Sequence, residues 1–453
     1  METREKQSGI LEGVIWKQLL LFFFPIRVGT FFQQLYNTVD TVIVVEFAGK
    51  EALSSVGGSS AQIINMVVGF FTGLTAGGTV LISQAYGASH RQRLEDALHT
   101  SYAFGILGGI GLGILGVAAA PLILRTMNTP QELMGMSTLY IRIYFLGLVF
   151  VFIYNMGAAI LRAVGDSKRP LYYLVVCCIV NIVLDLLLVL YFRLGVLGVA
   201  VATLISQAIS AALVTWTLMY QVDCMKLSFR KIRMHREVLK NMLQIGLPSG
   251  LQASMYSISN MIVQAALNLL GVDTMAAWTA YGKIDSVFWM INSSFGIALT
   301  TFVGQNFGAG KWDRVRRGTR VCLRMAVGTA ICLTAVLMMA GRFLLGIFTG
   351  DAVVVEIGLT MMRNIAPAFV MFVFIEIFSG SIRAQGYTFV TTVISVLGVC
   401  VFRIIWVSLI PPGQGLTRIV ACYPISWIIC AALVSGYYFY KKKRIIERME
   451  GKT

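Results

Sequence analysis

Asp40 is the first residue of this 453-residue chain whose surroundings suggest chemistry. It lies in the segment FFQQLYNTVDTVIVVEFAG, residues 31–49, just ahead of the apolar run VIVV. A charged side chain near the centre of a membrane-spanning helix costs on the order of 2.5 to 3.5 kcal/mol on insertion scales. Such a residue is expected to be compensated and functional, so Asp40 is a candidate for binding a proton or another cation.

A second acidic residue, Asp185, lies four residues after Asn181 in the apolar run LYYLVVCCIVNIVLDLLLVLYF, residues 171–192. Residues four apart lie on the same face of a helix, so this carboxylate and this amide form one polar patch. Carboxylate and amide oxygens are hard ligands, which suit an alkali cation better than a transition metal. A proton on the carboxylate would also neutralise the patch.

The elements that carry these residues are membrane-spanning helices. Hydrophobic residues make up 57% of the chain and charged residues 13%, and the mean hydropathy is +0.77. These values are typical of a polytopic all-α membrane protein, and the first span is expected to be retained rather than cleaved as a leader. Twelve spans are predicted: 14–46, 53–83, 98–124, 132–161, 169–192, 195–221, 239–270, 276–304, 318–346, 354–381, 388–410 and 416–440.

Basic residues gather in alternate loops, and they account for much of the net charge of +16. The clusters are HRQR (90–93), DSKRP (166–170), KLSFRKIRMHREVLK (226–240), KWDRVRRGTR (311–320) and KKKRIIER (441–448). The positive-inside rule places these loops and both termini in the cytoplasm. The chain is therefore expected to lie in the cytoplasmic membrane of a prokaryote, and its basic residues do not indicate nucleic-acid binding.

Two halves of the chain repeat each other at a spacing of 221 residues. ISQAYGASHRQR (82–93) aligns with VGQNFGAGKWDR (303–314), and LRAVGD (161–166) aligns with IRAQGY (382–387). Each half holds six predicted spans, so both insert in the same orientation, related by an axis along the membrane normal. The expected domains are an N-lobe (1–221), a cytoplasmic linker (222–238), a C-lobe (239–440) and a basic tail (441–453).

Parallel six-helix halves favour transport by alternating access through a central cleft. A duplicated static scaffold, such as a channel or a membrane-embedded enzyme, is the alternative. An enzyme is disfavoured because no predicted span contains a histidine as a metal ligand or base, apart from His99 near a helix start, and because no glycine-rich phosphate loop is present. The eight cysteines follow no metal-binding or disulfide pattern and are expected to serve packing.

The NTVD segment (37–40), the paired SQAYGA and GQNFGA turns and the LRAVGDSKRP turn resemble the multidrug and toxic compound extrusion (MATE) family, over about residues 12–440. The resemblance implies export of organic cations and amphipathic compounds in exchange for H⁺ or Na⁺. Its DinF-like branch has a cation site in the N-lobe, which here corresponds to Asp40, Asn181, Asp185 and Thr203. The NorM-like branch has an acidic residue in the seventh span, and LPSGLQASMYSISNMIVQAAL contains none.

If Asp40 and Asp185 share one site, they cannot both ionise cheaply, so the pair is expected to bind H⁺ or Na⁺. The alternative is a structural hydrogen-bond network that exchanges no proton. The positions that correspond in the second half are Val263, Phe402 and Trp406, so the acidic cluster is specific to the first.

Several polar, aromatic and proline positions are candidates for a substrate cleft or a gate. Pro25 and Pro248 are expected to kink the first helix of each half, and Glu376 is expected to pair with Lys283 or Arg403. The cleft and gating candidates are Gln33, Gln34, Tyr36, Asn37, Pro25, Met66, Phe70, Tyr256, Asn260, Asp285 and Glu376.

The sequence thus predicts a secondary multidrug efflux antiporter that is not an enzyme. It needs no cofactor beyond the coupling ion, H⁺ or Na⁺, and its partners are small organic substrates and the lipid bilayer. The chain is expected to be monomeric. The alternative is a flippase for lipid-linked oligosaccharides or another exporter of the same superfamily, although few arginines lie well inside the spans to bind a pyrophosphate.

Overall fold

A computed structural model describes residues 9–48, 52, 55–56, 58–127, 129–222, 224–411 and 415–449. The regular structure of these residues is entirely helical, which confirms the predicted all-α fold class. Eleven of the helical segments within them are long and apolar enough to cross a membrane. The twelfth predicted span, 239–270, is the 33-residue helix α9, which is long enough but more polar because it contains several serine, glutamine and asparagine residues.

The helices form two compact units. The first comprises Phe24–Gly250, and the second comprises Gly9–Phe23 together with the chain from Leu251 onward. The helices up to the middle of the chain are α1 (Gly9–Glu12), α2 (Ile15–Ile43), η1 (Val44–Ala48), α4 (Ser59–Gly87), α5 (Arg91–Thr126), α6 (Gln131–Ala163), α7 (Lys168–Asp185), η2 (Leu186–Tyr191), α8 (Gly195–Tyr220), η3 (Phe229–Lys231) and α9 (Arg236–Asn268).

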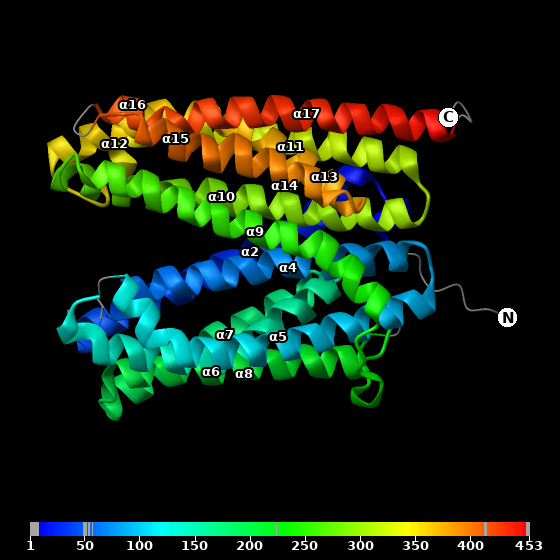
Figure 1. Cartoon of the computed structure of the whole chain (residues 1–453), viewed down its shortest axis with the longest axis horizontal. Coiled ribbons are helices and arrows are strands. Elements are labelled where there is room, and N and C mark those ends of the chain that lie inside the picture. Colours follow the sequence, from blue (N-terminus) through cyan, green and yellow to red (C-terminus); the bar gives the residue numbers. More distant parts are fainter. Residues whose placement is uncertain are drawn as a thin grey trace. The chain divides into compact units, whose positions relative to one another are not determined.

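The remaining helices all belong to the second unit. They are α10 (Val272–Gly308), α11 (Trp312–Gly346), α12 (Ala352–Ile365), η4 (Ala366–Ala368), α13 (Phe369–Ala384), α14 (Thr388–Ser395), η5 (Val396–Val401), α15 (Phe402–Ser408), α16 (Leu416–Val420) and α17 (Cys422–Met449). Within the first unit α6 packs between α5 and α8, and within the second unit α13 packs against α10, α11 and α17 (Figure 1).

The division into units differs from the domain boundary expected at residues 222–238. That segment belongs to the first unit because it packs against α5: the Ser228 backbone N–H donates to His99 Nε2 at 3.2 Å, and Thr100 Oγ1 donates to the Arg233 carbonyl at 3.4 Å. The units divide instead within α2 and α9, close to Pro25 and Pro248. Both helices are continuous through their prolines.

The 221-residue repeat is visible in the local backbone. α6 begins and ends 221 residues before the continuous span Ala352–Ala384, and Gly195–Tyr220 precedes Leu416–Lys441 by the same spacing. The turns match as well, because Gly165 and Gly386 have φ of 102° and 92°, while Ser89 and Gly310 have φ of 53° and 68°. The same short turns therefore join equivalent helices in both halves.

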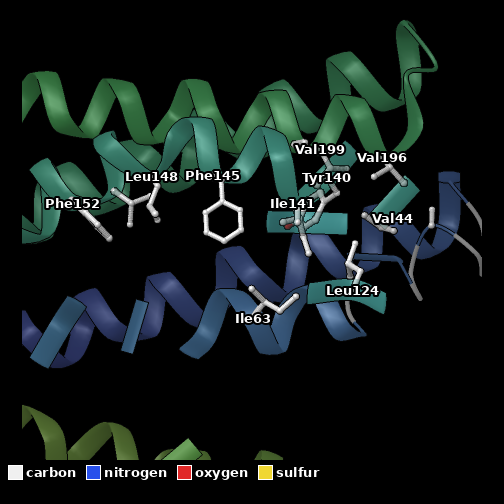
Figure 2. Packing of buried hydrophobic residues seen from close by; sticks show 14 of the residues in the cluster. Val44, Ile63, Leu124, Tyr140, Ile141, Phe145, Leu148, Phe152, Val196 and Val199 are labelled. Atoms are coloured by element: carbon white, nitrogen blue, oxygen red, sulfur yellow. The ribbon is translucent and has the colours of Figure 1, made fainter. Parts of the chain in front are cut away.

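An apolar core holds the first unit together. Its buried members come mainly from α4, α6 and α8, and Figure 2 shows the Phe145 ring of α6 directed toward the helix that carries Ile63. Leu148 and Val199 are fully buried in this cluster. Side chains of this size each contribute about 1.5–3 kcal/mol when they are transferred from water into a protein core. Where lipid surrounds the helices instead of water, van der Waals packing between the side chains supplies the stabilisation.

Two glycine pairs let α4 approach the N-terminal half of α9. Gly73 and Gly77 are four residues apart on α4, and Gly246 and Gly250 are four apart on α9. A Cβ atom at Gly77 would overlap the Met242 carbonyl oxygen, and one at Gly73 would overlap the backbone of Gly250. Small residues at this spacing allow helix backbones to pack closely in a membrane.

Candidate cation site

Three helices of the first unit bring the acidic residues together. Asp40 lies one turn before the end of α2, Asn181 and Asp185 lie in the last turns of α7, and Thr203 lies on α8. Asp185 is the final residue of α7 before the chain continues into the π-helical turn η2. Asn181 and Asp185 are fully buried, while Asp40 is half-buried.

Asn181 links the two acidic side chains. With its amide nitrogen turned toward them, Asn181 Nδ2 donates to Asp40 Oδ1 at 2.8 Å and to Asp185 Oδ2 at 3.3 Å. The opposite orientation would set the amide oxygen against acceptor oxygens only. The two carboxyl groups also lie within hydrogen-bond reach of each other. Because a carboxylate has no proton to donate, a bond between them needs one proton on the pair.

Thr203 reaches this network through a tyrosine. The Tyr36 hydroxyl donates to Thr203 Oγ1 at 3.4 Å and lies within hydrogen-bond reach of Asp40, one helical turn along α2. Tyr36, which was a cleft candidate, is thus part of the carboxylate network. Thr203 is at its edge.

Two further residues beside the carboxyl groups were missed by the sequence reasoning. Tyr140 of α6 lies next to both Asp40 and Asp185, and no spacing in the sequence distinguishes it from the other tyrosines. Cys177 lies four residues before Asn181 and within hydrogen-bond reach of Ser206 and Ser210. The four-residue spacing that joins Asn181 to Asp185 could have found it, because the same helix face carries all three.

The other first-unit candidates lie outside this network. Gln33, Gln34 and Asn37 are exposed side chains of α2. Met66 of α4 is exposed, and Phe70 packs against Gly250 at the glycine contact of α4 with α9. These residues remain candidates for a substrate path, but they do not contribute to the cation site.

The second unit has a basic group where the first has acidic ones. Arg403 is buried, and its guanidinium donates to Asn260 Oδ1 and to Ser426 Oγ, both at 3.1 Å. The guanidinium carbon also lies 4.0 Å from the ring centroid of Tyr423. A buried guanidinium repels cations, so the surroundings of Arg403 differ in charge from those of Asp40 and Asp185.

The ion pair expected between Glu376 and either Lys283 or Arg403 is absent from the described part of the chain. Glu376 Oε1 instead lies 3.6 Å from Arg383 Nη2, two helical turns along the same helix, α13. Sequence spacing alone gave no preference for this partner over cations on neighbouring helices.

Asp285 and Tyr256 also lie in the second unit. Asp285 accepts hydrogen bonds from Trp289 Nε1 at 2.6 Å and from the Tyr281 hydroxyl at 3.3 Å. The hydroxyl of Tyr256 is buried and has no hydrogen-bond partner among the described residues.

The side chains of the first-unit network can bind a proton as they stand, but they can bind a sodium ion only if the Asn181 amide turns. In the orientation given above Asn181 offers N–H groups, which cannot bind a metal ion. Rotation of the amide by half a turn would present its oxygen beside two carboxylates, and hard oxygen ligands of this kind suit an alkali cation. Binding of a sodium ion would therefore require the Asn181 amide to turn.

Two repeated sets of spanning helices, one of them with a buried acidic network, define a polytopic membrane protein of the two-repeat transporter class. The chain belongs to the MatE family, because the family model matches residues 25–187 and 248–408, once in each repeat. This membership confirms the family predicted from the NTVD segment and the paired turns. Assignment to the DinF-like branch stays a prediction.

Curated relatives match along nearly the whole chain. Probable multidrug resistance protein YoeA of Bacillus subtilis (strain 168) is 28% identical over 452 residues, covering 96% of each chain. Multidrug export protein MepA of Staphylococcus saprophyticus is 22% identical over 445 residues, again covering 96% of each chain.

Solved structures share the fold. One described as the outward-facing conformation of a multidrug resistance MATE family transporter of the MOP superfamily has a TM-score of 0.89 at 22% identity, covering 98% of this chain and 100% of the other. A MOP superfamily transporter from Pyrococcus furiosus, whose description reports a binding pocket of reversed polarity, has a TM-score of 0.89 at 21% identity, covering 98% and 99%. These likenesses confirm the two-repeat helical architecture.

Proposed function

We propose that this protein is a secondary active exporter of organic cations and amphipathic compounds, driven by uptake of H⁺ or Na⁺ at Asp40 and Asp185. The names of YoeA and MepA, relatives along 96% of the chain, support multidrug export. The observation that carries the coupling proposal is the hydrogen-bonded group of Asp40, Asn181 and Asp185, whose equivalents in the second repeat are not acidic or amide residues.

The acidic pair can couple because its two states differ in charge. With both carboxyl groups ionised, repulsion between them is opposed by the two N–H groups of Asn181. When a proton or Na⁺ arrives, the charge falls and the amide can turn its oxygen toward the site. Each state therefore favours a different arrangement of α2 against α7, and that difference in free energy is what a coupled transporter requires.

Orientation, location and assembly form part of the same proposal. The protein lies in the cytoplasmic membrane with both termini in the cytoplasm, as the basic loops predict. It acts as a monomer, as an N-lobe and a C-lobe that expose a central substrate path to each side in turn, and it has no catalytic activity.

Reconstitution tests the coupling directly. Proteoliposomes are loaded with a fluorescent organic cation such as ethidium, and either a pH gradient or a Na⁺ gradient is imposed alone. Uphill movement of the dye with one gradient identifies the coupling ion. If neither gradient drives uphill movement while the dye still equilibrates across the membrane, the protein is a passive carrier and the coupling proposal is wrong.

A further inference from the structure

A hollow in the second unit shares no residue with the carboxylate network. Its volume is about 410 Å³, and this figure includes the part of the hollow that is open to the outside. Its lining comes from the ends of three membrane spans, one that begins at Trp312 and two that end at Ala384 and Lys441, and from the turn 385–387. The hollow therefore lies at the depth where spanning helices meet the lipid headgroups.

The lining combines cations with aromatic rings. Arg316 contributes a guanidinium whose Nη2 atom is buried and has no hydrogen-bond partner among the described residues. Lys441 places its Nζ atom 3.8 Å from the ring centroid of Tyr387. Trp312 and Tyr438 complete the aromatic walls. An unsatisfied buried N–H of a guanidinium costs more than a neutral one, so this atom is suited to an anionic ligand.

Neighbouring cations of the same basic run are already used within the protein. Lys311 Nζ donates to the Leu11 carbonyl at 3.2 Å, and Arg314 Nη2 donates to the carbonyls of Ile10 and Gly13, both at 2.9 Å. These two residues bind α1 and the residue after it to the start of α11 within the second unit. Arg316 is two residues further along α11 and lines the hollow instead.

In the first repeat, the positions equivalent to Arg316 and Tyr387 carry acidic residues, which form ion pairs within the protein. The residue 221 positions before Arg316 is Glu95, which lies 3.4 Å from Arg91 Nε and 3.8 Å from Lys231 Nζ. The residue 221 positions before Tyr387 is Asp166, which lies 3.4 Å from Arg169 Nε. The first repeat supplies its own carboxylates at this corner, whereas the second supplies a guanidinium and an aromatic ring.

We propose that this hollow binds the phosphate group of an anionic phospholipid, which takes the place of the missing carboxylate. Arginine binds phosphate through parallel N–H groups, and basic pockets between spanning helices bind anionic headgroups. The depth of the hollow and the rings of Trp312 and Tyr438 favour a lipid over free phosphate, because aromatic side chains prefer the headgroup level. The lipid would tie the start of α11 to residues 438–441 of α17.

The test uses the full chain in a neutral detergent, with thermal unfolding and native mass spectrometry as readouts. The ligands are phosphatidylglycerol, phosphatidylcholine and inorganic phosphate. The variants are Arg316→Gln, Gln385→Glu and the matched control Arg317→Gln, which removes the neighbouring charge from an exposed position. Phosphatidylglycerol should raise Tm and remain bound in the mass spectrum, and phosphatidylcholine should do neither.

Arg316→Gln should weaken phosphatidylglycerol binding by about five- to tenfold, and Arg317→Gln should leave it within about twofold. Gln385→Glu adds a carboxylate to the lining of the hollow, close to Arg316, and should raise the lipid-free Tm while abolishing the response to phosphatidylglycerol. If Arg316→Gln fails to fold, the response of Gln385→Glu to phosphatidylglycerol decides whether the hollow binds the lipid. Equal lipid binding by the control and the two hollow variants would overturn the proposal, and so would an equal effect of inorganic phosphate.

Discussion

Asp40 and Asp185 show how a membrane helix can retain a carboxyl group whose placement in lipid costs free energy. The structure places Asn181, Asp185 and Tyr36 within hydrogen-bond reach of Asp40, and none of these three carries a positive charge. An arginine in the same place would cancel the charge permanently. Neutral donors leave the site able to gain and lose a cation, which is a property that coupling needs and a static scaffold does not.

Replacing Asp40 by Asn should uncouple transport without unfolding the protein. The amide mimics the neutralised carboxyl group, so the variant is expected to bind substrate and allow it to equilibrate. The gradient supplies about 2.3 kcal/mol per charge per 100 mV, and the variant cannot use it. Concentrative export should therefore be lost in proteoliposomes, with Tm unchanged or raised because an amide costs less to bury than a charge. Uphill export at the unmodified rate would reduce Asp40 to a packing residue.

Replacing Asn181 by Leu should destabilise the protein in a pH-dependent way. The change removes both N–H groups that oppose repulsion between the ionised carboxyl groups, at a cost of about 1–3 kcal/mol. Protonation removes the repulsion, so the fall in Tm should be larger at pH 8 than at pH 5.

Asn155→Leu is the matched control, because Asn155 donates to the Val151 carbonyl at 2.8 Å and should lose stability equally at both pH values. The same pH-independent loss for Asn181→Leu would mean that the carboxyl groups do not ionise in the folded protein.

At the scale of the helices, close packing depends on residues with no side chain. The α4 contact with α9 is made through Gly73, Gly77, Gly246 and Gly250, where backbone meets backbone. Backbone atoms cannot rotate away as side chains can, so a methyl group at this contact must push the helices apart.

Gly77→Ala should therefore lower the free energy of unfolding by about 1–3 kcal/mol, as overpacking of a well-packed interior does. Gly111→Ala is the control, because a Cβ atom there meets nothing within 4 Å, and alanine favours a helix over glycine by about 0.5–1 kcal/mol. The two variants should move Tm in opposite directions in the same detergent. A Gly77→Ala protein as stable as the control would show that the two helices can separate freely.

At the scale of the whole molecule, two repeats share one backbone plan but differ in the charged side chains at equivalent depths. Turn geometry is shared at Gly165 and Gly386, yet the first unit brings Asp40 and Asp185 together whereas the second buries Arg403. The two repeats therefore share a fold and differ in the residues placed within it. Coupling is expected to reside in the first.

Glu376→Gln tests this division of roles. Glu376 pairs with Arg383 at 3.6 Å in the second unit, and the change removes that pair without touching the Asp40 network. Stability is expected to fall by about 1 kcal/mol or less, because the pair is only partly buried, and gradient-driven export should remain measurable. Export under an imposed gradient and dye binding are measured on the same preparation. Complete uncoupling with intact binding would place the coupling site in the second unit.

The sequence by itself determined the medium, the helices and the repeat. Hydrophobic stretches of spanning length can satisfy their backbone only as helices in lipid, so composition and length suffice. The repeat was readable because the turns at residues 87–90 and 308–311 need the same backbone geometry and keep similar residues. Asp40 and Asp185 were identifiable because a carboxylate in such a segment is rare and costly.

Only the tertiary structure decided which side chains meet. Tyr36 joins the carboxyl group one turn away, Tyr140 arrives from α6, and Glu376 pairs with Arg383 rather than with a neighbouring helix. The hollow lined by Arg316 was equally unpredictable, because it is formed by three segments far apart in the chain, within 312–316, 382–387 and 438–441. Spacing along one helix predicts a face, but contacts between helices depend on rotation and tilt, and these are fixed by packing over the whole unit.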